Sequence, residues 1–556
     1  MLKKNEIIPL EITGMTNEGN GVGRYDGIAI FVPYTAVGDV IDCKIVKVQK
    51  SFCYGIVDKM IESSKERCDA KCNAFKKCGG CSFRHFNYSE ELRVKEDFVK
   101  SSFERIGKIF ADNEEILGAE STDRYRNKAQ YPVAEQNGKA VCGFYSKRSH
   151  RLVAFEDCLL QPKVFGEIAK CIIDYTNENK ISAYNEETGK GLLRHIYIRH
   201  GEHTGEIMVC LVVTNIKKSG KLYGIAGVLA KRLSNIISII LNENSKNTNV
   251  IMGKKFSLLY GQDYITDIMC GNKVKISASS FYQVNTIQAE RLYSLAEEYA
   301  VLKSDDILLD LYCGAGTIGL SMANKVKKLI GVEIIESAIE NAKENAKANG
   351  IENAEFICGD AGKIAKILYE RGERPNVIIA DPARKGCDRE TLEYMAKMSP
   401  DRIVMISCNH TTAARDCAIM EELGYRVEKY RAVDLFPRTT HVETVVMLSH
   451  KKPDSVINVK VEFGEGEGKV PLDNIAKRAE AYKPKERVTY KMIKEYIEAK
   501  YGFKVHTAYI AEVKRDLGLP MYDAPNAVEE LKQPRKHPTP EKVEAIKDAL
   551  KHFEVI

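Results

Sequence analysis

Cys408 is the residue of this chain whose type and position most directly suggest chemistry. It follows a short apolar run, residues 402–407, and lies downstream of a glycine-rich loop at residues 310–319 and of Asp381. If the run is a parallel strand, its carboxyl end faces the crevice in which open α/β sheets bind ligands. A thiol there, beside a glycine-loop cofactor site, predicts covalent catalysis. The alternative is an inert core cysteine, because free cysteines are often buried.

The loop at residues 310–319 contains the pattern Gly-Ala-Gly-Thr-Ile-Gly and is followed by Glu333. The spacing satisfies the dinucleotide fingerprint, so the loop alone leaves NAD and S-adenosylmethionine (SAM) open. NAD requires the loop to cradle a pyrophosphate. SAM carries no phosphate, and Asp310 ahead of the loop can instead meet its cationic amino-acid part. Because Asp381 and Cys408 follow downstream, the pattern favours SAM, with Glu333 on the ribose hydroxyls in either case.

Three cysteines form a tight cluster, and a fourth lies farther along the chain. Cys72, Cys78 and Cys81 lie close together, with two glycines between the last two that let the backbone fold round a metal. Cys158 is the best candidate for a fourth ligand, and Cys68 lies just upstream. Four thiolates suit zinc or an iron–sulfur cluster. Unligated cysteines are the alternative.

The composition indicates a large protein of several domains. The chain has 556 residues, more than one hydrophobic core normally holds. Its net charge of +6 is weakly basic, which permits an acidic partner without establishing one. No apolar run approaches the roughly 18 residues of a spanning helix, and the first residues lack the apolar core of a signal peptide. We therefore expect a cytoplasmic protein with no membrane partner, whose cysteines are mainly thiols.

Five segments with different patterns predict the domain organisation. Residues 1–62 alternate apolar and polar positions between glycine-rich turns, which predicts an OB-like β-barrel. Residues 63–285 predict a β-rich central domain with the cysteine loop, and residues 286–450 alternate seven strands with helices. Residues 451–486 predict a linker, and residues 487–556 a small helical domain of unknown role. The fold class is a multidomain α/β protein with a doubly wound parallel sheet.

The first segment resembles a TRAM domain, which is an RNA-binding module, and residues 1–450 as a whole resemble the RNA (uracil-5-)-methyltransferases. Within that family the chain resembles the iron–sulfur 23S rRNA type, whose catalytic domain is a seven-stranded Rossmann-like fold. Seven ordered motifs carry the resemblance: Cys72-x5-Cys78-Gly-Gly-Cys81, Tyr125-Arg-Asn-Lys128, Phe281-Tyr-Gln-Val-Asn285, Asp310-Leu-Tyr-Cys-Gly-Ala-Gly316, Asp381-Pro-Ala-Arg384, Ser407-Cys-Asn409 and His441-Val-Glu443.

The resemblance implies a role for each set of motif residues. Cys408 would be the nucleophile and Glu443 the base. Asp381 would orient the base or SAM, and Arg384 would hold an RNA phosphate or a neighbouring residue. The SAM contacts would be Gln283, Tyr312, Thr317, Glu333, Asp360 and Asp381, beside Asp310, Gly314 and Gly316 of the loop. The ligands of a 4Fe-4S cluster would be Cys72, Cys78, Cys81 and Cys158. The RNA contacts would be Arg126, Lys128 and Phe281, and Phe281 could stack either on the target base or on SAM.

The reaction that the resemblance implies explains why these residue types are needed. Uracil C5 is a poor nucleophile until a thiolate adds at C6, which makes an enolate that can take a methyl group. A carboxylate must then remove the C5 proton so that the thiolate leaves. The base must be flipped out of its stack, because C5 and C6 meet two reagents on opposite sides. We therefore expect SAM-dependent formation of 5-methyluridine in 23S rRNA.

The chain departs from the family pattern at three single positions. His410 stands where the family usually has proline, Thr317 stands where some members carry asparagine, and Cys68 lies outside the four-cysteine pattern. The tail at residues 487–556 is not part of the common core either. None of these differences removes a catalytic atom, so activity is still expected.

Three alternative functions remain. A tRNA uracil C5 methyltransferase would use the same chemistry, but tRNA relatives usually lack both the iron–sulfur motif and the TRAM segment. An NAD-dependent oxidoreductase with a structural metal would use the same glycine loop. A non-catalytic rRNA-binding factor would keep the fold, although the intact pair of Cys408 and Glu443 counts against it. No obligate protein partner is expected.

Overall fold

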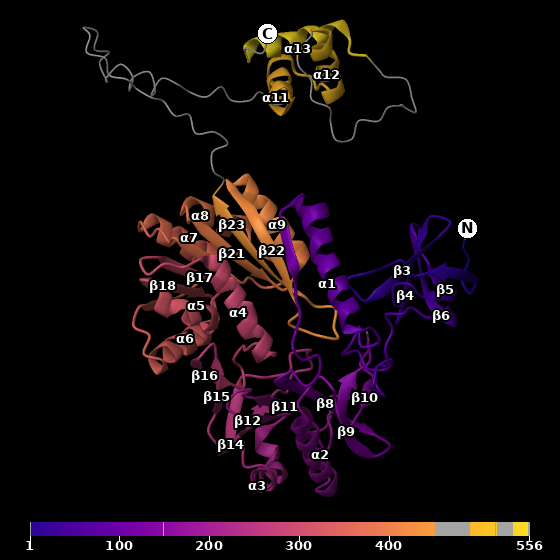
Figure 1. Ribbon diagram of the computed structural model, residues 1–556, viewed down its shortest axis with the longest axis vertical. Coiled ribbons are helices and arrows are strands. Elements are labelled where there is room, and N and C mark those ends of the chain that lie inside the picture. Colours follow the sequence, from indigo (N-terminus) through magenta and orange to yellow (C-terminus); the bar gives the residue numbers. More distant parts are fainter. Residues whose placement is uncertain (1, 148, 451–489, 518, 520–536, 554–556) are drawn as a thin grey trace. The chain divides into compact units, whose positions relative to one another are not determined.

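The computed structural model describes residues 2–147, 149–450, 490–517, 519 and 537–553 (Figure 1). It divides into two compact units, Met1–Asp454 and Ser455–Ile556. The predicted linker at residues 451–486 lies outside the described residues. In the part of the chain that the structure describes, no helix is long and apolar enough to cross a membrane.

The N-terminal segment forms a six-stranded sheet with the order β1-β5-β6-β4-β3-β2. Alternate residues point to its core, among them Ile41, Cys43 and Ile45 of the fifth strand, as the period of a strand requires. The strands are β1 (Ile7–Glu11), β2 (Gly14–Met15), β3 (Asn20–Tyr25), β4 (Ile28–Pro33), β5 (Val40–Val48) and β6 (Phe52–Glu62). The segment predicted to be a barrel is thus a β-sheet domain of six strands.

The central sheet has seven strands in the order β10-β9-β8-β11-β12-β13-β14. Apolar side chains of α2 and α3, such as Phe165, Ile172 and Leu229, share a core with strand residues such as Ile198 and Leu211. The elements are β8 (Lys128–Gln136), β9 (Lys139–Tyr145), β10 (Leu152–Ala154), α2 (Lys163–Glu178), β11 (Leu193–His200), β12 (Ile207–Val213), η2 (Ile216–Lys218), η3 (Gly220–Leu222), α3 (Tyr223–Arg232), β13 (Ile236–Glu243) and β14 (Lys255–Gly261). A separate hairpin follows, β15 (Tyr264–Met269) and β16 (Asn272–Ser277).

The third sheet is the doubly wound one, with the order β19-β18-β17-β20-β21-β23-β22-β7. Its order reverses between β17 and β20, which in open α/β sheets places a ligand crevice at the carboxyl ends of those strands. Separate apolar cores cover its two faces. The strands are β17 (Ile307–Leu311), β18 (Lys328–Glu333), β19 (Ala354–Cys358), β20 (Val377–Ala380), β21 (Arg402–Ser407), β22 (Tyr425–Val433) and β23 (Glu443–His450). The helices are α4 (Thr286–Ala300), α5 (Thr317–Met322), η4 (Ala323–Lys325), α6 (Glu336–Ala348), α7 (Ala361–Glu370), α8 (Arg389–Lys397) and α9 (His410–Glu422).

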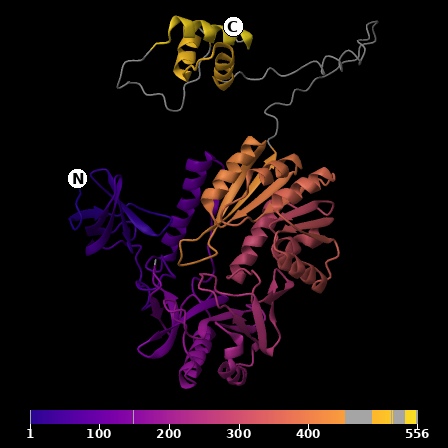
Figure 2. The ribbon, with the colours of Figure 1, turned by 180° about the vertical axis from the view of Figure 1, so that it is seen from behind.

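An eighth strand joins this sheet from far upstream in the chain. β7 (Asp112–Leu117) pairs in parallel with β22, and both views show it as a purple strand beside the orange sheet (Figures 1 and 2). The helix before it, α1 (Tyr88–Ser102), and the π-helical turn η1 (Phe103–Gly107) also pack on that sheet's core. The sequence assigns residues 63–285 to one central domain and seven strands to the catalytic sheet. In the structure, residues 88–117 belong with the catalytic sheet instead.

Within the described residues of the C-terminal unit there are three short helices. They are α11 (Tyr490–Tyr501), α12 (Thr507–Asp516) and α13 (Pro540–His552). Ile497, Ile510 and Ile546 are fully buried among them. These helices fall within the helical domain predicted for residues 487–556.

Candidate active site and cysteine site

Cys408 lies directly after the carboxyl end of β21 and just before the N-terminus of α9. The thiol is half-buried. The next residue, Asn409, caps the helix by accepting a hydrogen bond from the N–H of Thr411 at 3.2 Å. Its Nδ2 also donates to the carbonyl of Arg384 at 3.1 Å. The thiol is therefore held at a fixed turn between a buried strand and a capped helix.

Glu443 is brought beside this thiol by the sheet register. β23 runs antiparallel to β21, and Ser407 pairs with Thr444, so Cys408 and Glu443 adjoin that pair at the same edge of the sheet. The Glu443 side chain is buried, with a residue exposure of 5%. Burial and the neighbouring Asp381 raise the pKa of Glu443 to about 8. A carboxyl with such a pKa can take up a proton near neutral pH.

The electrostatics of the crevice disfavour further negative charge. Burial, Glu443 and Asp381 raise the pKa of the Cys408 thiol to about 11, against a lowering effect of Arg384. Burial raises the pKa of Asp381 to about 7. The Arg384 Nη2 lies 3.2 Å from Nδ1 of His441, at the rim of the site. Arg384 is thus placed to stabilise the ionised forms of both the thiol and the Glu443 carboxyl.

The glycine loop closes over the carboxyl end of β17. Gly314 and Gly316 have φ values of 55° and 79°, in the left-handed region that glycine adopts readily. The N–H of Gly314 donates to Oε2 of Glu333 at 3.2 Å, and the N–H of Gly319 donates to Oδ2 of Asp310 at 2.9 Å. These bonds fix the two predicted carboxylates on either side of the loop.

Asp310 and Gly314 provide the structural test for a cationic ligand here. Oδ1 of Asp310 is buried and has no hydrogen-bond partner among the described residues, and burial raises the pKa of this carboxyl to about 8. A Cβ at Gly314 would meet open space, so the loop leaves room beside it. A buried carboxyl oxygen with no partner among the described residues suits the ammonium or sulfonium group of SAM.

The remaining predicted SAM contacts separate into two groups. The hydroxyl of Tyr293 lies 3.3 Å from Oγ1 of Thr317, hydrogen-bonds the Gln283 side chain and faces Asp381. Tyr293 is not among the site residues predicted from the sequence, because a tyrosine on an amphipathic helix usually indicates a residue of the hydrophobic core. The second group lies elsewhere along the sheet edge: Tyr312 packs toward Cys387 and Thr391, and Asp360 caps α7 by accepting from the N–H of Lys363 at 3.2 Å.

Of the predicted RNA contacts, Arg126 and Lys128 form a cationic cluster, and Phe281 is exposed and available for stacking. Burial, Arg199 and Arg126 lower the pKa of Lys128 to about 8, which means that three positive charges lie close together. Phe281 is 73% exposed, an unusual state for a large apolar side chain.

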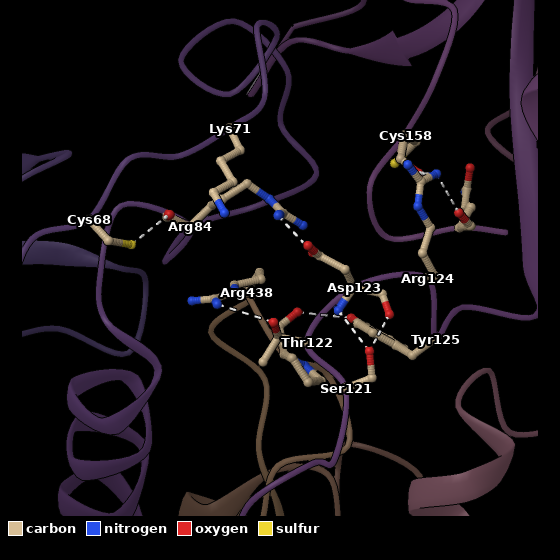
Figure 3. Close-up of polar contacts among 12 residues, drawn as sticks. Cys68, Lys71, Arg84, Ser121, Thr122, Asp123, Arg124, Tyr125, Cys158 and Arg438 are labelled. Atoms are coloured by element: carbon tan, nitrogen blue, oxygen red, sulfur yellow. Dashed lines mark hydrogen bonds and ion pairs between the residues drawn. The ribbon is translucent and has the colours of Figure 1, made fainter. Parts of the chain in front are cut away.

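The four predicted cluster ligands line one cavity of about 830 Å³, together with Arg126 and Lys128. Burial raises the pKa of Cys158 to about 12, with further contributions from Cys81, Cys78 and Cys72. Cys68 instead donates to the carbonyl of Phe86 at 2.8 Å. Figure 3 shows Cys68 and Cys158 on opposite sides of the Arg84 and Asp123 pair.

The four thiols are not in a coordinating arrangement in the described structure. Among residues 2–147, 149–450 and the described C-terminal helices, no group of three or more His, Cys, Asp or Glu side chains is placed to hold a metal ion. The donor set nonetheless fits an iron–sulfur cluster, because four thiols converge on one cavity and influence one another electrostatically.

Comparisons with known proteins agree with this arrangement. Residues 87–451 match the family described as tRNA (Uracil-5-)-methyltransferase, and residues 2–57 match the TRAM domain. A protein of Clostridium tetani named as an uncharacterized RNA methyltransferase is 41% identical over 449 residues, which is 81% of this chain and 97% of that one. One of the same name from Halalkalibacterium halodurans is 42% identical over 451 residues, or 81% of this chain and 98% of that one.

A solved structure has the same fold. It is the Pyrococcus abyssi tRNA (uracil-54, C5)-methyltransferase in complex with S-adenosyl-L-homocysteine, with a TM-score of 0.64 and 25% identity, covering 79% of this chain and all of that one. The predicted fold class and the predicted similarity to the RNA (uracil-5-)-methyltransferase family are therefore confirmed. The chain belongs to the SAM-dependent RNA uracil-5-methyltransferases of the tRNA (uracil-5-)-methyltransferase family, with an N-terminal TRAM domain.

Proposed function

We propose that this protein methylates C5 of a uridine in 23S rRNA through a covalent adduct on Cys408. The observation that carries the proposal is the placement of Cys408 and Glu443 at one edge of adjacent strands, beside the glycine loop. A nucleophile, a base with a pKa of about 8 and a cofactor loop are the three parts that the chemistry needs.

In the proposed reaction the Cys408 thiol loses its proton to solvent, and Arg384 supplies a nearby positive charge that favours the thiolate. The thiolate sulfur forms a bond to C6 of the flipped uracil, and the electrons of the C5–C6 double bond move into an enolate. SAM supplies the methyl group, which becomes bonded to C5. Glu443 then accepts the proton from C5, and the bond between C6 and the Cys408 sulfur breaks, which restores the thiolate and the uracil double bond. The pKa of about 8 lets Glu443 accept this proton and release it to solvent near neutral pH.

Asp381 lies near both Glu443, the proposed base, and Tyr293, which belongs to the proposed SAM site. It raises the pKa of Glu443 and faces Tyr293, which contacts Thr317 and Gln283. We assign Asp310 and Glu333 to holding SAM, together with Tyr293 and its partners Thr317 and Gln283. We assign Asp381 to orienting the reacting groups.

RNA binding has one further support in the structure beyond the cationic cluster, a group of aromatic rings on the TRAM sheet. Phe31, Phe52 and Tyr54 form a group of touching rings on β4 and β6, with centroids 5.4 to 5.8 Å apart. None of the three belongs to the TRAM core, and Lys47 lies opposite Tyr54 on β5. Rings flanked by cations on the outer face of a sheet stack well with unpaired bases.

We further propose that Cys72, Cys78, Cys81 and Cys158 hold a 4Fe-4S cluster. With the TRAM segment, this motif favours 23S rRNA over tRNA as the substrate. The second candidate is tRNA, because the Pyrococcus abyssi neighbour is named as a tRNA (uracil-54, C5)-methyltransferase.

A mechanism-based trap separates these substrates. Fluorine at C5 cannot leave as a proton, so RNA that contains 5-fluorouridine should arrest the wild-type enzyme as a methylated adduct. We expect a shifted band on a denaturing gel with a 23S rRNA fragment and none with Cys408→Ala. A band with tRNA alone would move the substrate to tRNA, and no band with either RNA would contradict the covalent mechanism.

A further inference from the structure

The loop at residues 434–442, which leads from β22 into Glu443, is hydrogen-bonded to the cysteine segment. The carbonyl of Arg438 accepts the backbone N–H groups of Ser82 and Phe83 at 2.9 and 3.1 Å. These two residues directly follow Cys81. The chain that holds the cysteines therefore contacts the loop that ends at the proposed base.

Arg438 adopts a conformation that needs support from its surroundings. Its φ of 69° lies in the left-handed region, which is uncommon for a residue with a side chain. Its backbone N–H donates to Oε1 of the buried Glu91 at 2.6 Å. Its guanidinium donates to the carbonyl of Phe86 and to Oγ1 of Thr122, each at 3.1 Å. A strained backbone held by this many bonds persists only while those partners stay in place.

A second connection runs through side chains from the cysteines to the same arginine. Arg84 is 5% exposed, contacts the Cys81 thiol and forms an ion pair with Asp123 at 2.7 Å. Asp123 is the chain neighbour of Thr122, which accepts from Arg438. Figure 3 shows both bonds, Arg84 with Asp123 and Arg438 with Thr122.

We propose that Arg438 is a positioning residue that couples the four-cysteine site to Glu443. An ordered cysteine segment holds the Arg438 carbonyl and side chain, and the loop then delivers Glu443 beside Cys408. When the segment loosens, the loop at residues 434–442 loosens with it, while the glycine loop keeps its own bonds to Asp310 and Glu333. The coupling rests on the proposed roles of Glu443 and of the four cysteines.

Hydrogen exchange of the loop tests the coupling without relying on activity. Cys78→Ser is compared with Cys68→Ser. Cys68 does not line the cavity, and a serine hydroxyl at its position can keep the hydrogen bond to the Phe86 carbonyl that Arg438 also uses. We expect Cys78→Ser to lose iron and to exchange about tenfold faster at residues 434–442, the effect of one or two lost hydrogen bonds. Binding of S-adenosylhomocysteine should change less than about twofold, since the glycine loop is intact. Cys68→Ser should match the wild type. Lost iron with unchanged exchange at residues 434–442 would overturn the proposal.

A second variant keeps the thiols and tests the arginine directly. Thr122→Val removes the Oγ1 acceptor of Arg438, and Thr188→Val, which removes an exposed hydroxyl outside this network, is the matched control. We expect Thr122→Val to retain its iron, to exchange severalfold faster at residues 434–442 and to lower kcat more than it raises KM for RNA. Wild-type exchange and kcat in Thr122→Val would refute the role of Arg438. A wild-type protein that binds no iron would contradict the proposed cluster, and the Thr122→Val result would still decide the coupling.

Discussion

Replacing Glu443 with glutamine should make Cys408 more reactive and the enzyme inactive. The pKa of the thiol is about 11, roughly 2 above its ordinary 9.0, with burial as the largest cause and Glu443 as the second. Removing the Glu443 charge should therefore lower the thiol pKa by about one pH unit, which corresponds to about 1.4 kcal/mol. Between a pH of about 8, above which Glu443 is ionised, and the thiol pKa, the thiolate fraction then rises about tenfold, and the rate of alkylation follows it.

Iodoacetamide labelling of the Cys408 peptide, followed by mass spectrometry across a range of pH, measures this change. The same variant should turn over RNA about 100-fold or more slowly, because the general base is gone. A methylated protein–RNA adduct should accumulate, since the C5 proton stays in place. Glu428→Gln is the control: that carboxylate is exposed on β22, where it bonds Ser449.

Two results would refute this reasoning. An unchanged alkylation profile in Glu443→Gln would show that the carboxylate does not act on the thiol. Free methylated RNA at the normal rate would show that another group removes the proton.

Three further predictions concern binding, pH and the nucleophile. Cys408→Ala should abolish methyl transfer with S-adenosylhomocysteine affinity nearly intact by calorimetry; a large loss of affinity would indicate a structural role. Phe31→Ala should weaken binding of single-stranded RNA about tenfold in a gel-shift assay, because one stacked ring contributes 1 to 3 kcal/mol, roughly; Ile56→Ala, on the same sheet, should change it little. In the absence of SAM, the melting temperature should fall as the pH rises from about 5 to about 8, and Asp310→Asn should flatten that profile. A melting temperature that rises across this interval would contradict the buried-carboxyl assignment.

The sign of the pH effect follows from the direction of the shifts. The folded pKa values of Asp310 and Glu443, about 8, and of Asp381, about 7, lie above the ordinary carboxyl values of 3.8 and 4.5. Between those limits the folded protein holds more protons than the unfolded chain, so raising the pH favours unfolding. Catalysis has the opposite trend, since Glu443 accepts a proton only in its ionised form. Activity should therefore increase as the pH passes through about 8, while the stability of the SAM-free protein decreases.

The sequence predicts the catalytic sheet well because its signals are local. The apolar run before Cys408 and the glycine loop each lie within a short window, and the structure places both at the expected edge of the sheet. β7 carries no such signal. Of its six residues only Ile116 is buried, and its partner β22 lies roughly three hundred residues away in sequence. An edge strand with one buried side chain has no clear period, so only the tertiary pairing identifies it.

The same distinction explains which parts of the site the sequence missed. Motifs identify residues that do chemistry, such as Glu443, but not the contacts that place them. The support from Arg438 depends on a positive φ and on backbone carbonyls, neither of which leaves a pattern in side-chain types. Tyr293 is likewise hidden, because its position on α4 suits a core residue. Positioning groups are therefore the part of this site that needed three-dimensional information.

The charged groups around Cys408 favour binding of the cationic methyl donor before the thiolate forms. Asp310, Asp381 and Glu443 are three carboxyls whose pKa values are all raised, so these side chains by themselves disfavour a thiolate. Arg384 is the cation that acts on both Cys408 and Glu443, and its single charge leaves the thiol pKa at about 11. A cationic ligand in the crevice lowers all of these pKa values at once, because an opposite charge favours each ionised form. The proposed nucleophile should thus be most reactive when the cationic methyl donor is already bound, which protects a half-buried thiol from alkylation or oxidation in its absence.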